Sequence, residues 1–214
     1  MNRKFYTLIV LITAAATLLV SCKSASKLYR QGNYDEAVEA AVKKLQKKPG
    51  DAEMKALIQS AYQYAVTDHE KRIQNYSAST SDLKYEWIYA EYSGLQNLYN
   101  AIHRAPEIVE LVHPADYSSY VTTYREKAAD AHTARGITWM NQNNRESYKK
   151  AFREFQAASG FKPDDIKIQQ LLNHAYDAAV TRVVITQTDN ENYLFSAYSY
   201  SNTQNAMDLS LIHI

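Results

Sequence analysis

Two stretches of this chain match each other without a gap, and this internal repeat restricts the possible folds more than any other feature of the sequence. Residues 34–67 align with residues 148–181 at an offset of 114, and eleven of the thirty-four aligned positions are identical. The identities include Tyr34 with Tyr148, Ala37 with Ala151, Pro49 with Pro163, Leu57 with Leu171, and Ala61 and Tyr62 with Ala175 and Tyr176. Such units cannot bury their apolar face alone, so we expect them to stack on their neighbours.

The first copy contains the residues that a helix, a turn and a second helix need. Gly32 lies where the chain must turn, because glycine accepts the left-handed conformation that often ends a helix. Tyr34 and Ala37 begin the next helix-forming run. Pro49 ends it, because the residue before a proline is biased out of the helical conformation.

The second copy replaces the turn glycine with residues 143–146, which begin with two asparagines. Asparagine also tolerates the left-handed conformation, so we expect a turn here as well. Together the copies resemble the tetratricopeptide repeat. The resemblance implies that helices pack within each unit through Gly32, Tyr34, Ala37, Pro49 and Tyr62 in the first copy and Tyr148, Ala151, Pro163 and Tyr176 in the second.

Composition and spacing predict helices throughout the region of the repeats. Five glycines and four prolines in 214 residues favour helices over a barrel or sandwich. Apolar residues three and four apart predict a helix over 52–76, and we expect further helices over 83–104, 116–140 and 146–159, and another after Pro163. Asp82 and Asp116 are the expected caps of two of them, and Pro106 and Pro114 bracket an expected connection.

The predicted fold is therefore all-α: an antiparallel array of helical hairpins, a tetratricopeptide-like α-solenoid, over residues 28–181. Past Val180 the residues alternate and are rich in β-branched side chains. A short strand pair and a continued helix are equally compatible with residues 182–208, so we expect an uncertain C-terminal region to start there.

The first residues have the pattern of an export signal. Arg3 and Lys4 precede an uncharged run of sixteen residues, 5–20, which is shorter than the roughly 20 residues of a membrane-spanning helix. Ser21 and Cys22 follow, and with the preceding residues they resemble the lipobox of bacterial lipoproteins. This resemblance covers only the first 22 residues. An ordinary secretory signal that ends near a cysteine is the alternative.

The lipobox resemblance implies cleavage between Ser21 and Cys22, with covalent diacylglycerol and a fatty acyl chain on Cys22. Cys22 is the only cysteine in the sequence, so it has no intramolecular disulfide partner. We accordingly expect residues 1–21 to be a signal peptide and residues 22–27 a lipid anchor with a short tether.

Charge and motifs favour no enzyme class. Removing Arg3 and Lys4 from 24 basic residues leaves 22 against 23 acidic ones, which gives no reason to expect a nucleic-acid partner. The six histidines show no metal-ligand spacing, and we expect His69 and His174 to be packed or hydrogen-bonded helix residues. Asp164 and Asp165 are expected to complement a helix dipole. We predict no catalytic residues, metal or cofactor apart from the lipid.

The eighteen tyrosines are the other unusual feature. Tyrosine buries a large ring, keeps its hydroxyl at the rim, and is a favoured residue at the centre of interfaces. We expect most of them in packing positions. The candidate groove residues are Tyr62, Tyr85, Tyr89, Tyr120 and Tyr124.

The last six residues, 209–214, match the translation of a transposon-based sequencing adapter. We expect them to be an artefact that is excluded from fold reasoning, and the natural protein to continue beyond Asp208. A natural apolar C-terminus is the alternative.

These features predict a non-enzymatic interaction scaffold of the Gram-negative cell envelope. It would be anchored by lipid to the outer membrane, face the periplasm, and bind another envelope protein or peptide. Its plan resembles the repeat-containing lipoprotein of the outer-membrane-protein assembly machine. The alternatives are a glycan-binding lipoprotein of the starch-utilisation type, and a mounting for a missing C-terminal ligand-binding or enzymatic domain. Lys23 directly after the cysteine speaks against surface export, although inner membrane and cell surface both remain open.

Overall fold

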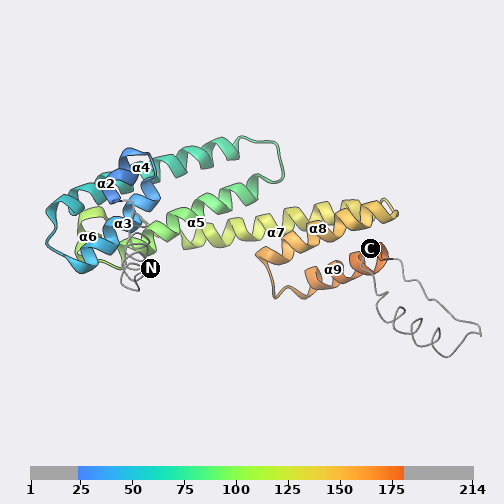
Figure 1. Cartoon of the computed structure of the whole chain (residues 1–214). Coiled ribbons are helices and arrows are strands. Elements are labelled where there is room, and N and C mark those ends of the chain that lie inside the picture. The colour runs from blue at the N-terminus through green and yellow to red at the C-terminus, as the bar shows by residue number, and fades with distance from the viewer. Residues whose placement is uncertain (1–23, 181–214) are drawn as a thin grey trace, which may run out of the picture. The chain divides into compact units, whose positions relative to one another are not determined.

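The computed structural model describes residues 24–180, which form helices and connecting turns without a strand (Figure 1). The chain divides into two units, residues 1–180 and 181–214. The predicted signal peptide, the lipidation of Cys22, the strand pair and the adapter-like end all lie outside the described residues. Within 24–180 the helices are α2 (Ala25–Arg30), α3 (Tyr34–Lys47), α4 (Ala52–Ser77), α5 (Lys84–Ile102), α6 (Pro106–Val112), α7 (Ser118–Met140), α8 (Arg145–Phe161) and α9 (Ile166–Ala179).

Most successive helices turn back on each other, which confirms the predicted all-α antiparallel array (Figure 1). The main packed pairs are α2 with α3, α3 with α4, α4 with α5, α5 with α7, α7 with α8, and α8 with α9; α3 also contacts α5, and α2 contacts α4. The short helix α6 packs on α4 and α5. None of the helices between residues 24 and 180 combines the length and apolar character that crossing a membrane requires.

The predicted turns have the expected backbone. Gly32, between α2 and α3, has a φ of 79°. Asn143, between α7 and α8, has a φ of 51°, so the asparagine adopts the left-handed conformation that glycine supplies in the first copy. Asn144 then begins α8 with a capping box, in which its side chain and that of Ser147 each accept a hydrogen bond from the other's backbone N–H.

Three details of the prediction were wrong or incomplete. Asp82 does not cap α5; the Ser81 hydroxyl instead accepts the Leu83 N–H at 3.2 Å. The segment between Pro106 and Pro114 is not a plain connection but contains α6, because a proline fits the first turn of a helix. Asp116 accepts the Ser118 N–H at 2.8 Å and so supports the start of α7, although Tyr117 holds the capping position.

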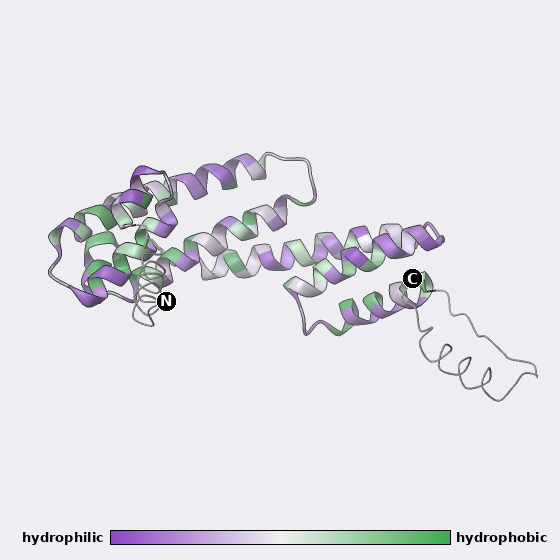
Figure 2. Ribbon diagram, viewed as in Figure 1, coloured by the Kyte–Doolittle hydropathy of each residue, from purple (hydrophilic) through white to green (hydrophobic). Residues whose placement is uncertain are grey.

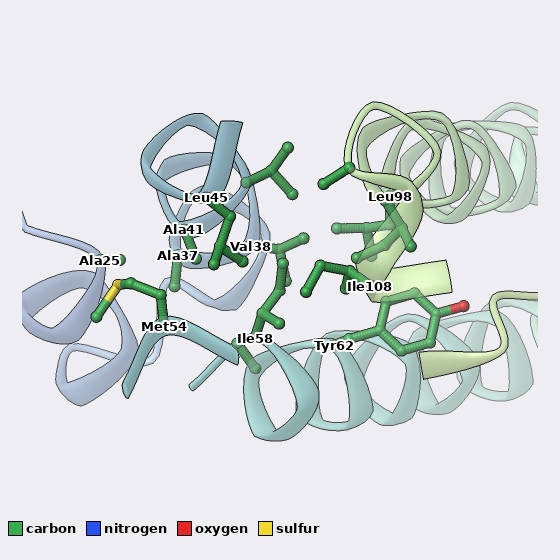
Figure 3. Close-up of a cluster of buried hydrophobic side chains, with 14 of the residues drawn as sticks. Ala25, Ala37, Val38, Ala41, Leu45, Met54, Ile58, Tyr62, Leu98 and Ile108 are labelled. Atoms are coloured by element: carbon green, nitrogen blue, oxygen red, sulfur yellow. The ribbon is translucent and has the colours of Figure 1, made fainter. Parts of the chain in front are cut away.

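The largest core cluster joins α2 to α6, and Figure 2 shows the apolar residues of these helices gathered between them. Small residues let α3 approach its neighbours: Ala37 and Ala41 have no exposed surface. Figure 3 shows Ile58 and Tyr62 of α4 reaching toward Leu98 and Ile108. In the second copy Ala151 and Phe155 are likewise fully buried, as the predicted packing role of Ala37 and Ala151 requires.

Candidate functional site

A pocket of about 270 Å³ opens between α4, α5 and the beginning of α7. Its lining residues come from α4, α5 and the start of α7: Glu70, Ile73, Gln74, Tyr92, Leu95, Tyr117 and Tyr120. The packing of α5 against both α4 and α7 brings them together. The volume lies near the lower end of typical ligand sites, which hold roughly 300–1,000 Å³.

Three tyrosine rings form one wall of this tyrosine pocket, as we call it below. The Tyr92 ring stacks on the Tyr120 ring with centroids 4.8 Å apart and an angle of 13°. The Tyr117 ring is tilted to both, at 6.1 Å from Tyr92 and 6.4 Å from Tyr120. Tyr120 is half exposed although its ring is packed, so it combines a fixed position with access from solvent.

The tyrosine pocket is electronegative. Burial raises the pKa of the Tyr117 hydroxyl to about 12, and the negative charge of Glu70 adds to this effect. Burial also raises the pKa of Tyr92, and the negative charge of Glu70 adds to that rise. The Tyr92 and Tyr117 phenols are therefore neutral hydrogen-bonding groups at physiological pH, and Glu70 also lines the pocket.

The five predicted groove tyrosines do not lie in one groove. Tyr120 lines the pocket, and Tyr124 stacks on Tyr92 at 5.2 Å. Tyr85 lies beneath the ammonium groups of Lys84 and Lys127, while the Tyr89 ring meets Phe161 edge to face. Tyr85, Tyr89 and Tyr124 are not among the residues that line the pocket.

Tyr62 is a core residue, which corrects its assignment to the groove. It is 7% exposed and packs in the cluster of α2 to α6 (Figure 3). Burial raises the pKa of its hydroxyl, and a hydrogen bond with the Ala115 backbone opposes that rise. Its repeat equivalent Tyr176 is 49% exposed, so the same residue has different surroundings in the two copies.

Sequence reasoning missed Tyr92, Tyr117 and Glu70. The spacing of Tyr117, Tyr120 and Tyr124, three and then four residues apart, was an available signal, because it places the three rings on one face of a helix. Nothing in the sequence indicated that Tyr92 of α5 would meet that face.

A buried polar centre links α3, α4 and α5. The His69 ring makes a hydrogen bond to each of two carboxylates: Nδ1 lies 2.6 Å from Glu91 Oε2, and Nε2 lies 3.0 Å from Asp35 Oδ2. Arg72 donates to the same Glu91 oxygen at 2.8 Å. Burial lowers the pKa of His69, but the hydrogen bonds and charges of Asp35 and Glu91 outweigh burial and raise it above its ordinary value of 6.5.

A second centre repeats this arrangement between α5, α7 and α8. His132 Nδ1 lies 2.8 Å from Glu154, Nε2 lies 3.3 Å from Glu86, and Arg135 donates to Glu154 at 2.8 Å. Each histidine, arginine and shared glutamate lies 63 residues after its counterpart (132 minus 69, 135 minus 72, 154 minus 91). The pairs Ala65 with Ala128 and Tyr85 with Tyr148 follow the same offset.

This second offset shows that the array has three related units, α3–α4, α5–α7 and α8–α9. Each centre joins the histidine of one unit to a carboxylate of its own first helix and a carboxylate of the next unit. The predicted hydrogen-bonded role of His69 is confirmed. His132 was missed, although the shared His-x-x-Arg spacing in α4 and α7 was a signal for it.

Other predicted polar residues have structural positions. Asp165 caps α9 by accepting the N–H groups of Lys167 and Ile168, as the dipole argument anticipated. His174, predicted to be a packed or hydrogen-bonded helix residue, lies in α9 but is exposed, so it is not packed. Among the described side chains, no three histidine, cysteine, aspartate or glutamate groups are arranged to hold a metal ion.

Comparison with known proteins adds no family to this description: no family model, curated protein or solved structure matches the chain.

Proposed function

We propose that this chain is a lipid-anchored protein of the bacterial envelope whose helical array binds a segment of another protein in the tyrosine pocket. The observation that carries the proposal is the pocket itself, in which Tyr120 is half exposed and held in place by Tyr92. Tyrosine rings fixed in this way give large contact areas with little loss of side-chain entropy on binding.

The array suits binding for a second reason. The two histidine centres fix the angle between successive units through buried hydrogen bonds, so the three walls of the pocket are held by a rigid frame. A preformed pocket loses less free energy on ordering than a flexible surface does. The proposed role needs no catalytic step.

The anchor is proposed from the sequence. Lipid on Cys22 would hold the array at a membrane, and the proposed position is the periplasmic side of the outer membrane. Replacing Cys22 with serine should abolish labelling of the protein by radioactive palmitate and release it from the membrane fraction. Unchanged labelling in that variant would contradict the lipid anchor.

Partner binding is tested by capture from cross-linked membranes with the full chain as bait. Tyr120→Ala should lose most of a co-purifying envelope protein, because it removes the exposed ring of the pocket. Tyr64→Ala is a matched control: Tyr64 is 51% exposed against 50% for Tyr120, and it stacks on Tyr34 at 5.1 Å as Tyr120 does on Tyr92. Equal capture by both variants would count against the pocket as the binding site.

A glycan ligand is the competing outcome. Capture of polysaccharide that depends on Tyr120, with no protein partner, would favour the starch-utilisation alternative.

A further inference from the structure

We infer that the tyrosine pocket takes a basic side chain, lysine or arginine, from the partner segment. The inference rests on the proposed function, because it names the chemistry of the group that the partner inserts. Its first support is charge: among the described residues that line the pocket, Glu70 is the one that carries a formal charge. A group of opposite charge is therefore the complementary occupant.

The rings add to the attraction for a cation. The face of a tyrosine ring is electronegative and attracts lysine and arginine within about 6 Å. The Tyr120 ring is half exposed although it stacks on Tyr92, and the Tyr117 ring is tilted to it at 6.4 Å, so an inserted cation would be close to both Tyr120 and Tyr117. Burial is the main cause of the raised pKa values of Tyr92 and Tyr117, and the charge of Glu70 is a smaller contribution to both.

The same chemistry occurs within the chain beside the pocket. The ammonium group of Lys127 lies 5.0 Å from the centroid of the Tyr124 ring, and that ring stacks on Tyr92. The Tyr124 ring of α7, together with Tyr85 of α5, therefore already holds one cation from the chain itself. The pocket offers a partner the same type of surface, with Glu70 added.

Size and ring packing favour a side chain over a sugar chain. A volume of about 270 Å³ suits one side chain better than an oligosaccharide. Tyr92 stacks on both Tyr120 and Tyr124, so its faces are engaged with other rings instead of forming an open platform for a pyranose ring.

The test is fluorine NMR of the mature full-length protein, labelled with fluorotyrosine and held in detergent micelles. The probes are acetylated and amidated tripeptides with arginine, lysine or glutamine between two glycines, and maltoheptaose. We expect the arginine and lysine peptides to shift the signals of Tyr92, Tyr117 and Tyr120, and to leave Tyr34 and Tyr64 unchanged. The glutamine peptide and the sugar should shift none of them.

Variants of Glu70 decide the role of charge. Glu70→Gln should weaken binding of the basic peptides about threefold to fivefold, the range expected for one partly exposed ion pair. Glu70→Lys should abolish it. Glu53→Gln, an exposed glutamate in the first turn of the same helix, is the control and should bind like the unaltered protein.

The outcomes separate this inference from the proposed function. If Tyr120→Ala loses the partner but Glu70→Gln and Glu70→Lys bind it normally, the pocket binds a partner and the inferred basic side chain is wrong. Binding of maltoheptaose with no shift from the basic peptides would overturn the inference in favour of a sugar.

Discussion

In the first histidine centre the His69 ring lies against the backbone of Gly94, whereas in the second the His132 ring stacks on Phe161 at 5.8 Å. The two histidine rings have the same types of polar partner, two carboxylates each. Each has an inner glutamate that is 13% or 15% exposed and an outer carboxylate that is 44% or 45% exposed. The hydrogen-bonding frame is thus shared between the units, while the apolar packing around it differs.

The positions of the glycines differ between the two helix pairs in the same way as the apolar packing does. In the α4–α5 pair a Cβ on Gly94 would lie 2.5 Å from the His69 ring, and in the α7–α8 pair a Cβ on Gly136 would lie 2.4 Å from the Phe155 ring. The position equivalent to Gly94 in α8 is Ala157 (94 plus 63). Each helix pair therefore has a glycine opposite whichever ring needs room, instead of at a fixed position in the repeat.

The largest expected loss of stability comes from substitutions that remove the glutamate shared by the histidine and the arginine of each centre. Glu91→Ala leaves His69 and Arg72 without their common acceptor and should lower the free energy of unfolding by about 2–3 kcal/mol. This is less than for a fully buried ion pair, because Arg72 is 42% exposed. Glu154→Ala should cost a similar amount, measured by urea unfolding. A cost confined to one centre would show that the two frames are not equivalent.

The second prediction compares the stability changes caused by substitutions at two equivalent positions, Gly94 in α5 and Ala157 in α8. Gly94→Ala should destabilise the protein by about 2 kcal/mol, because the His69 ring is held by two carboxylates and cannot move away. Ala157→Gly should cost only about 1 kcal/mol, through helix propensity alone. Gly160→Ala is the control: a Cβ there would meet nothing within 4 Å, so it should be neutral or slightly stabilising. A stable Gly94→Ala variant would contradict the close contact.

The smallest effect is the pH dependence of the first centre. The pKa of His69 is raised in the folded protein by Asp35 and Glu91, against burial and the charge of Arg72. The protonated ring therefore stabilises the fold fully below the ordinary value of 6.5, and this stabilisation is lost as the pH rises through the higher folded pKa. The stability difference between the protein and His69→Gln should shrink over that rise. A stability difference between the two proteins that grows as the pH rises would contradict a raised pKa of His69 in the folded protein.

The sequence predicted the features that depend on local backbone and on contacts within one unit. Gly32 and Asn143 turn as expected, and Ala37 and Ala151 pack as expected, because each position is determined by its own hairpin. Tyr62 and Tyr176 show that contacts between units could not be predicted in this way. They occupy equivalent positions, but Leu98, Ile102 and Ile108 pack beside Tyr62, and no described helix follows α9 to cover Tyr176.

The pocket was less predictable for the same reason. Tyr117 and Tyr120 share a helix face by spacing, but Tyr92 and Glu70 join them only through the packing of α4, α5 and α7. Contacts of this kind depend on the angle between units, and the hydrogen bonds of the two histidine centres join those units. The offset of 63 residues is present in the sequence, for example in the shared His-x-x-Arg spacing, but it does not indicate which side chains meet between the units.

The most direct test of the central claim is photo-cross-linking in living cells, with benzoylphenylalanine in place of Tyr120 or, separately, of Tyr64. These exposed tyrosines are matched in accessibility and ring stacking. We expect a discrete protein adduct from position 120 that is absent at position 64. No adduct at position 120, or the same adducts at both positions, would contradict the claim that the tyrosine pocket binds a partner protein.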